Sequence, residues 1–121
     1  MNIIIDPDQL DQYKQKYTVL ELDTIRLIPS GQEIKAYCVV ENIPIVEMPD
    51  VDSKVKLHEN LIIEYKKRNW NFCEQAIEHL MGRWGHELDS FYQDVLNRVD
   101  KYKQQEPEET WDGVIEKNTD S

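Results

Sequence analysis

The protein has 121 residues and a formal net charge of −10, with 40% hydrophobic and 31% charged residues. This length suffices for one compact core, and the apolar content predicts a globular chain and not a disordered one. No apolar run approaches the roughly 20 residues that cross a bilayer, and the first residues lack the basic segment and cleavage site of a signal peptide. We therefore expect one cytoplasmic domain over residues 1–121, with no membrane partner and an oligomeric state that the sequence leaves open.

The acidic residues gather at the two ends of the chain. Residues 1–50 hold nine acids and four bases, residues 51–105 hold nine of each, and residues 106–121 hold six acids and one base. Acidic ends repel the phosphates of DNA and RNA, so nucleic acid is not expected as a direct partner. A basic protein surface fits such a field better.

The first 50 residues predict a β-hairpin region. Residues 2–5 are typical of a short strand, and Asp6 or Asp8 can cap a short polar helix over residues 7–17. Two longer apolar–polar alternations follow, at residues 18–28 and 33–41, on either side of a proline–glycine turn.

The phase of the first alternation slips near Thr24, which predicts a β-bulge there. We expect one face of the hairpin to be buried and to pack on the helices that follow, because a sheet face needs an apolar partner layer. That face carries Leu20, Leu22, Ile34, Ala36 and Cys38. The next segment contains Pro44 and Pro49 and is expected to add a short edge strand, since proline excludes a central one.

From Asp52 the apolar period becomes helical. Three helices are predicted over residues 52–68, 70–84 and 86–103, and Pro107 is expected to end the last one. Their core is predicted to contain Tyr65, Trp70, Cys73, Ile77, Leu80, Tyr92, Val95 and Val99. The fold class is therefore α+β: an N-terminal β-hairpin or small antiparallel sheet, then a three-helix antiparallel bundle over residues 51–105.

The acidic tail, residues 106–121, is expected to dock back on the helices as a clasp. Trp111 supplies the apolar anchor, Asp112–Gly113 makes a turn, and the residues after Glu116 are expected to fray. The rival interpretation leaves Trp111 exposed as an anchor for a partner.

The helical half resembles two known arrangements. Tyr65, Trp70 and the small Cys73 are similar to the helix junction of tetratricopeptide-like repeats. A longer pattern resembles the segment that follows the catalytic domain in many bacterial class III adenylate/guanylate cyclases. The residues that match it are Tyr65, Arg68, Trp70, Tyr92, Arg98, Pro107, Trp111, Asp112 and Gly113.

This resemblance covers about residues 57–117 and implies a module, not an activity, because residues 1–50 are too few for a cyclase catalytic domain. The chain as a whole also resembles uncharacterised small proteins of marine bacteriophages, although no motif residue carries that likeness.

The residues that usually carry chemistry do not form a pattern. The histidine–glutamate pairs at residues 58–59, 78–79 and 86–87 are adjacent in sequence, so their side chains diverge around a helix and do not predict a metal site. His58 on an apolar stripe indicates a hydrogen-bonded core histidine. Cys38 and Cys73, far apart among apolar neighbours, indicate buried thiols. We expect no cofactor and no catalytic residue.

A noncatalytic protein–protein interaction or regulatory module is the function that the sequence favours. The residues predicted to bind a partner are Lys66, Lys67, Arg68, Trp84, Trp111 and Asp112. The basic patch at residues 65–68 can equally be a set of cations at a helix C-terminus, or a site for the chain's own tail. The alternatives are an acidic inhibitor or nucleic-acid mimic of phage type that acts on a basic host protein, and a small enzyme whose site is not recognised.

Overall fold

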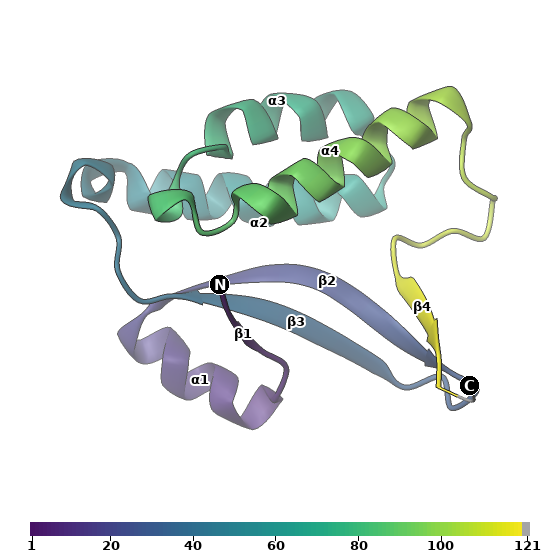
Figure 1. Ribbon diagram of the computed structural model, residues 1–121, viewed down its shortest axis with the longest axis horizontal. Coiled ribbons are helices and arrows are strands. Elements are labelled where there is room, and N and C mark those ends of the chain that lie inside the picture. Colours follow the sequence, from purple (N-terminus) through teal and green to yellow (C-terminus); the bar gives the residue numbers. More distant parts are fainter. Residues whose placement is uncertain (120–121) are drawn as a thin grey trace. The chain divides into compact units, whose positions relative to one another are not determined.

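The computed structural model describes residues 1–119, which form an α+β protein (Figure 1). The chain divides into two compact units. The first, called the sheet unit here, holds Met1–Glu41 and the end of the chain from Asp112; the second, called the helical unit, holds Asn42–Trp111. The single domain over residues 1–121 and the packing of the hairpin face on the helices stay predictions.

The sheet unit contains four strands in the order β1-β3-β2-β4, and one helix. The elements are β1 (Asn2–Ile4), α1 (Pro7–Lys16), β2 (Thr18–Ile28), β3 (Glu33–Val40) and β4 (Ile115–Asn118). The predicted hairpin is confirmed, since β2 and β3 pair in an antiparallel way. The sheet is mixed and not wholly antiparallel as predicted, because β4 runs parallel to β2.

The start of the chain follows its local signals. The side chain of Asp6 accepts a hydrogen bond from the backbone N–H of Asp8 at 2.9 Å and so caps α1. The predicted bulge is also confirmed, because the register between β2 and β3 shifts between Glu21 and Thr24. Leu20 and Leu22 are buried before the shift, as is Thr24 after it.

The prediction that the chain frays after Glu116 is wrong. Lys117 and Asn118 belong to β4, in register with Leu27 and Ile28 of β2 (Figure 1). The prediction rested on the lack of apolar side chains, but a strand at a sheet edge is held by backbone hydrogen bonds, which any residue type supplies. The last two residues of the tail lie outside the described residues.

The helical unit contains three longer helices and two short helical turns. They are η1 (Ile45–Asp50), α2 (Val51–Lys66), α3 (Trp70–Leu80), η2 (Trp84–His86) and α4 (Asp89–Gln104). Helix α3 packs on both α2 and α4. The predicted core is confirmed, since all eight of its side chains are buried.

Two predictions for the helical unit are wrong. Residues 45–50 form a 3₁₀ helix and not an edge strand: the N–H of Glu47 donates to the carbonyl of Pro44 at 2.9 Å, and the Glu47 carboxylate binds the backbone of Trp84 and Gly85. The second helix stops at Leu80 and does not reach Trp84; of the two glycines that the sequence offers as C-terminal caps, Gly82 and Gly85, it is Gly82, with a φ of 83°, that follows the helix end. Trp84 therefore lies in the loop between α3 and α4.

Candidate protein-binding surface

The two most exposed large aliphatic side chains of the described residues, Ile45 and Val46, lie on η1 together with the exposed Met48. Ile45 is 82% exposed, Val46 is 86% exposed and Met48 is 56% exposed. These three side chains are called the η1 surface here. Contiguous exposed apolar side chains can mark a protein-interaction site, whereas single exposed ones are common.

A buried carboxylate between these side chains holds η1 in place. Glu47 is 9% exposed, and its two carboxylate oxygens accept hydrogen bonds from the backbone N–H groups of Trp84 at 2.5 Å and Gly85 at 3.3 Å. Trp84 and Gly85 take φ angles of 58° and 59°, and their N–H groups both point at the Glu47 carboxylate, while the N–H of His86 donates to the carbonyl of Arg83. The chain therefore satisfies these two backbone donors with a charged acceptor of its own.

Arg83 adds a second attachment at the other end of η1. Its guanidinium donates to the carboxylate of Asp50 and to the backbone carbonyl of Glu47 at 3.4 Å. Asp50 is the last residue of η1, directly before α2. With Glu47 and Asp50 both turned toward the loop between α3 and α4, the aliphatic side chains point into solvent.

Trp84, one of the residues predicted to bind a partner, is an interior residue. It is 1% exposed, and its indole N–H donates to the Tyr92 hydroxyl at 3.0 Å. The same hydroxyl lies 2.9 Å from Nδ1 of His58, which is fully buried, so the predicted hydrogen-bonded core histidine is confirmed. These contacts leave the Trp84 ring no free face for a partner.

Arg68, the next of these residues, binds the end of the helical unit. It follows α2 with a φ of 65°. Its guanidinium donates to the backbone carbonyls of Pro107 at 3.2 Å, Glu108, Glu109 at 3.3 Å and Trp111 at 3.2 Å. It also pairs with the carboxylate of Glu106 at 3.2 Å. The Arg68 guanidinium is therefore already bound by carbonyls and a carboxylate of the same chain.

Trp111 lies in an aromatic cluster of the helical unit. Its ring centroid is 5.4 Å from that of Tyr65, 5.6 Å from that of Trp70 and 5.2 Å from that of Tyr102, all in edge-on arrangements. The guanidinium carbon of Arg68 lies 5.4 Å from the Trp111 ring. Such geometry favours both aromatic contacts and the cation–π contact. Trp111 is half-buried by these neighbours.

The other predicted partner-binding residues are Asp112, Lys66 and Lys67. Asp112 belongs to the sheet unit and accepts a hydrogen bond from Arg26 at 2.6 Å, which lowers the pKa of its carboxyl. Lys66 is half-buried and Lys67 is exposed at the end of α2. Of the six predicted residues, the structure brings Arg68 and Trp111 into contact.

The groups that could carry chemistry are buried or dispersed. Burial raises the pKa of the Cys73 thiol to about 12, with the charge of Glu64 as a second cause. A thiol of this kind is not a nucleophile at neutral pH. Among residues 1–119, no three His, Cys, Asp or Glu side chains gather closely enough to hold a metal ion. No helix in this part of the chain is long and apolar enough to cross a membrane.

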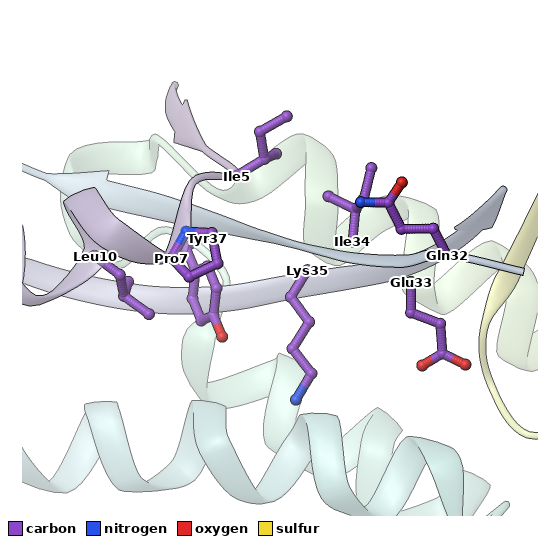
Figure 2. Close-up of a pocket in the computed structure, with 8 residues that line it drawn as sticks. All are labelled: Ile5, Pro7, Leu10, Gln32, Glu33, Ile34, Lys35 and Tyr37. Atoms are coloured by element: carbon purple, nitrogen blue, oxygen red, sulfur yellow. The ribbon is translucent and has the colours of Figure 1, made fainter. Parts of the chain in front are cut away.

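The sheet unit contains a hollow of about 310 Å³ beside β3 (Figure 2). Ile5, Pro7 and Leu10 line one side, and residues 32–35 with Tyr37 line the other. In Figure 2 the side chains of Lys35 and Glu33 do not converge on a common point. The hollow therefore offers a place for a side chain or a strand, and not a set of catalytic groups.

Comparison with known proteins finds no family model, no curated protein and no solved structure that matches this chain.

The sequence contained a signal for the η1 surface that the strand interpretation concealed. Ile45, Val46 and Met48 are apolar, lie between two prolines, and follow neither the period of a strand nor that of a helix. A run that cannot pair in a sheet and is too short for an amphipathic helix has few ways to be buried.

Proposed function

We propose that this chain is a noncatalytic interaction module whose η1 surface inserts into an apolar groove of a protein partner. One observation carries the proposal: Ile45 and Val46 are 82% and 86% exposed on a turn that the buried Glu47 holds. Because Glu47 already fixes the conformation of η1, the segment loses little conformational entropy when it binds. Covering Ile45 and Val46 in an apolar groove would remove their exposed apolar area from water, which favours association.

The charges around η1 define the rim of the partner's groove. Asp52 is exposed next to η1, whereas Glu47 is buried and Asp50 pairs with Arg83; residues 42–52 contain no base. Electrostatic complementarity then favours a groove that is apolar at its base and basic at its edge. The acidic balance of the whole chain favours the same partner.

In this proposal the helical unit is a rigid platform, an antiparallel three-helix bundle with residues 106–111 docked on it as a clasp, whereas the tail from Asp112 belongs to the sheet unit. The contacts of Arg68 and Trp111 support the clasp. Tyr65, Arg68, Trp70 and Trp111 also match the segment that follows the catalytic domain of class III cyclases, and their mutual contacts support a related module. We place this module in the cytoplasm.

The test compares two surface variants in photo-crosslinking capture from a lysate of the native host. Ile45→Ser with Val46→Ser removes the η1 surface, and Ile63→Ser is the matched control, since Ile63 is an exposed aliphatic residue on α2 (49%). We expect a partner that native protein and control capture equally and that the η1 variant loses. The purified partner should then bind the η1 variant about tenfold or more weakly, because two anchor side chains are gone.

The same experiment separates the alternatives. Capture that is unchanged in the η1 variant overturns the proposed surface. A captured nucleic-acid-binding protein that DNA displaces from both native protein and η1 variant favours the acidic inhibitor or mimic of phage type. Turnover of a small molecule by the purified chain favours the enzyme.

A further inference from the structure

The edge of the sheet beside β1 is incompletely covered. Within residues 1–119, β1 pairs with β3 from Tyr37 to Val39, and the chain then leaves the sheet at Ile5. The first half of β3, residues 33–36, has β2 as its one neighbouring strand in the described structure. Such an uncovered edge is a template for another strand unless the protein blocks it.

The hydrogen-bond phase decides which backbone groups face this edge. The N–H of Leu27 donates to the carbonyl of Gln32 at 2.8 Å, in the same register that pairs Arg26 with Glu33. In an antiparallel ladder, bonded and non-bonded pairs alternate, so Glu33 and Lys35 occupy non-bonded positions against β2. Their N–H and C=O groups therefore point away from β2, toward the uncovered edge.

The side chains of this edge follow a charged–apolar–charged order. Glu33, Ile34 and Lys35 are consecutive, and both charged residues are exposed; the Glu33 carboxylate also accepts hydrogen bonds from Arg26 of β2, at 3.0 Å and 3.2 Å, within the same chain. Read in the opposite direction, the order is lysine, isoleucine, glutamate. An antiparallel strand of the same sequence centred on Ile34 thus places Glu33 opposite Lys35 twice and Ile34 opposite itself.

This register also satisfies the backbone. The two Glu33–Lys35 positions are those whose N–H and C=O groups point outward, so each can exchange both hydrogen bonds with its counterpart. The central isoleucines then occupy a non-bonded pair, where side chains approach most closely. Backbone, charge and apolar contacts agree on one register.

The space beside the edge admits a second strand. The hollow of about 310 Å³ runs along residues 32–35 and is bounded by Ile5, Pro7 and Leu10 (Figure 2). Figure 2 shows the side chains of Ile5 and Ile34 on the same side of the β3 ribbon. Ile5 is 56% exposed, so an apolar side chain of an added strand would cover it.

We infer that two copies of this chain associate through these edges, as a two-fold dimer in which Glu33 of each copy lies opposite Lys35 of the other. A two-fold axis through the Ile34 pair makes the contact self-complementary and closed. Because three residues of each copy form the ladder, the dimer is weak and depends on concentration. The inference does not rest on the η1 surface.

Charge exchange tests this register in the full chain. Lys35→Glu gives two facing pairs of glutamates, and Glu33→Lys gives two facing pairs of lysines. We expect native protein to approach the dimer mass in sedimentation velocity between about 10 and 500 µM, and each variant alone to dissociate about tenfold or more readily. An equimolar mixture of the two variants should recover the dimer, because every facing pair is again of opposite charge.

A second measurement does not depend on how the variants fold. In native protein, the amide hydrogens of Glu33 and Lys35 should exchange more slowly as concentration rises, whereas that of Ile34, already turned toward β2, should not change. Ile45→Ser with Val46→Ser should dimerise like native protein. A native chain that stays monomeric over this range overturns the inference, as does a dimer that both charge variants retain, or concentration-independent exchange at both amides.

Discussion

Helices α2 to α4 and the η1 segment differ in which side chains they bury: the helices bury apolar ones, and η1 buries a carboxylate. On the helices, apolar side chains at steps of three and four face inward, as at Cys73, Ile77 and Leu80, which are at most 1% exposed. On η1 the carboxylate of Glu47 faces inward and the aliphatic Ile45 and Val46 face solvent. On η1 the buried position goes to the residue that can accept hydrogen bonds from the backbone of Trp84 and Gly85, and not to the most apolar residue.

The loop between α3 and α4 explains the reversal. Trp84 and Gly85 have positive φ angles, so their N–H groups have no place in a helix and need an acceptor nearby. Glu47 supplies it, and a charged acceptor bonded to two donors is stronger than a neutral one. The aliphatic neighbours of Glu47 are exposed because the glutamate takes the inward position.

The largest difference in stability between substitutions in the helices and on η1 is expected at Trp70. This ring stacks on Tyr102 at 5.3 Å and meets Tyr65 and Trp111 edge-on. Trp70→Ala should lower the free energy of unfolding by about 3–5 kcal/mol, because the surrounding rings cannot close the cavity. Urea unfolding measures it, with Ile45→Ala as the control, expected to change stability by about 0.5 kcal/mol or less. A Trp70→Ala variant as stable as native protein would contradict the aromatic cluster.

The next largest loss of stability is expected at Glu47, a buried polar residue. Glu47→Ala leaves the N–H groups of Trp84 and Gly85 without their acceptor, and should cost about 2–3 kcal/mol of stability. Glu47→Gln keeps an acceptor oxygen and should cost about half as much. The matched control is Val46→Ala, next to it in sequence but exposed. Equal stabilities of Glu47→Ala and Val46→Ala would show that η1 is not held by its carboxylate.

Substitution of Arg68 should change stability less, because losing its hydrogen bonds destabilises the fold while relieving its positive φ angle stabilises it. Arg68→Ala removes the donors to the carbonyls of Pro107 and Trp111 and should cost about 1–2 kcal/mol. Arg68→Gly removes the same donors but relieves a backbone with φ of 65°, so it should be about 1 kcal/mol more stable than Arg68→Ala.

Trp111 fluorescence reports the same contact, with Trp70 and Trp84 replaced by Phe. We expect emission that is blue-shifted with Arg68 present and shifts to the red in Arg68→Ala, as the segment that carries Trp111 loosens. Emission that is already red-shifted and freely quenched with Arg68 present would reject the clasp and return Trp111 to the role of a partner anchor.

Local patterns determine what the sequence could predict. The bulge near Thr24, the cap at Asp6 and the inward residues of α2 to α4 follow from alternation, capping residues and helical period, and all three were predicted. The direction of η1 depends on Glu47 meeting N–H groups 37 and 38 residues later, which no local pattern records. Strand β4 depends on backbone hydrogen bonds to β2, which leave no signature in residue type.

The same limit applies to the predicted partner-binding residues. Trp84 and Trp111 were chosen because large aromatic side chains anchor partners, and their neighbours inside the chain could not be known from spacing alone. Aromatic residues serve cores and interfaces equally well. The pattern of residues 42–50 predicts a short edge strand, so it does not predict that Ile45, Val46 and Met48 lie exposed on one short turn.

At neutral pH the smallest effect on stability is expected from the ionisation of Cys73, because the thiol keeps its proton in the folded and the unfolded chain. Burial raises the pKa of its thiol from 9.0 to about 12 in the folded chain. Below pH 9 both states keep the proton, and the contribution of Cys73 to stability is fully present. As the pH rises from about 9 toward 12, the unfolded chain releases this proton while the folded chain retains it, so stability falls.

Cys73→Ala isolates this dependence, because lysine and tyrosine side chains titrate in both proteins alike. The difference between the unfolding free energies of native protein and Cys73→Ala should be constant up to about pH 9 and should shrink above it. Urea unfolding at pH 7, 9 and 10.5 measures this difference. A difference in unfolding free energy that stays constant over all three pH values would mean that the core tolerates the Cys73 thiolate. Burial in the helices would then penalise a charged group less than its raised pKa indicates.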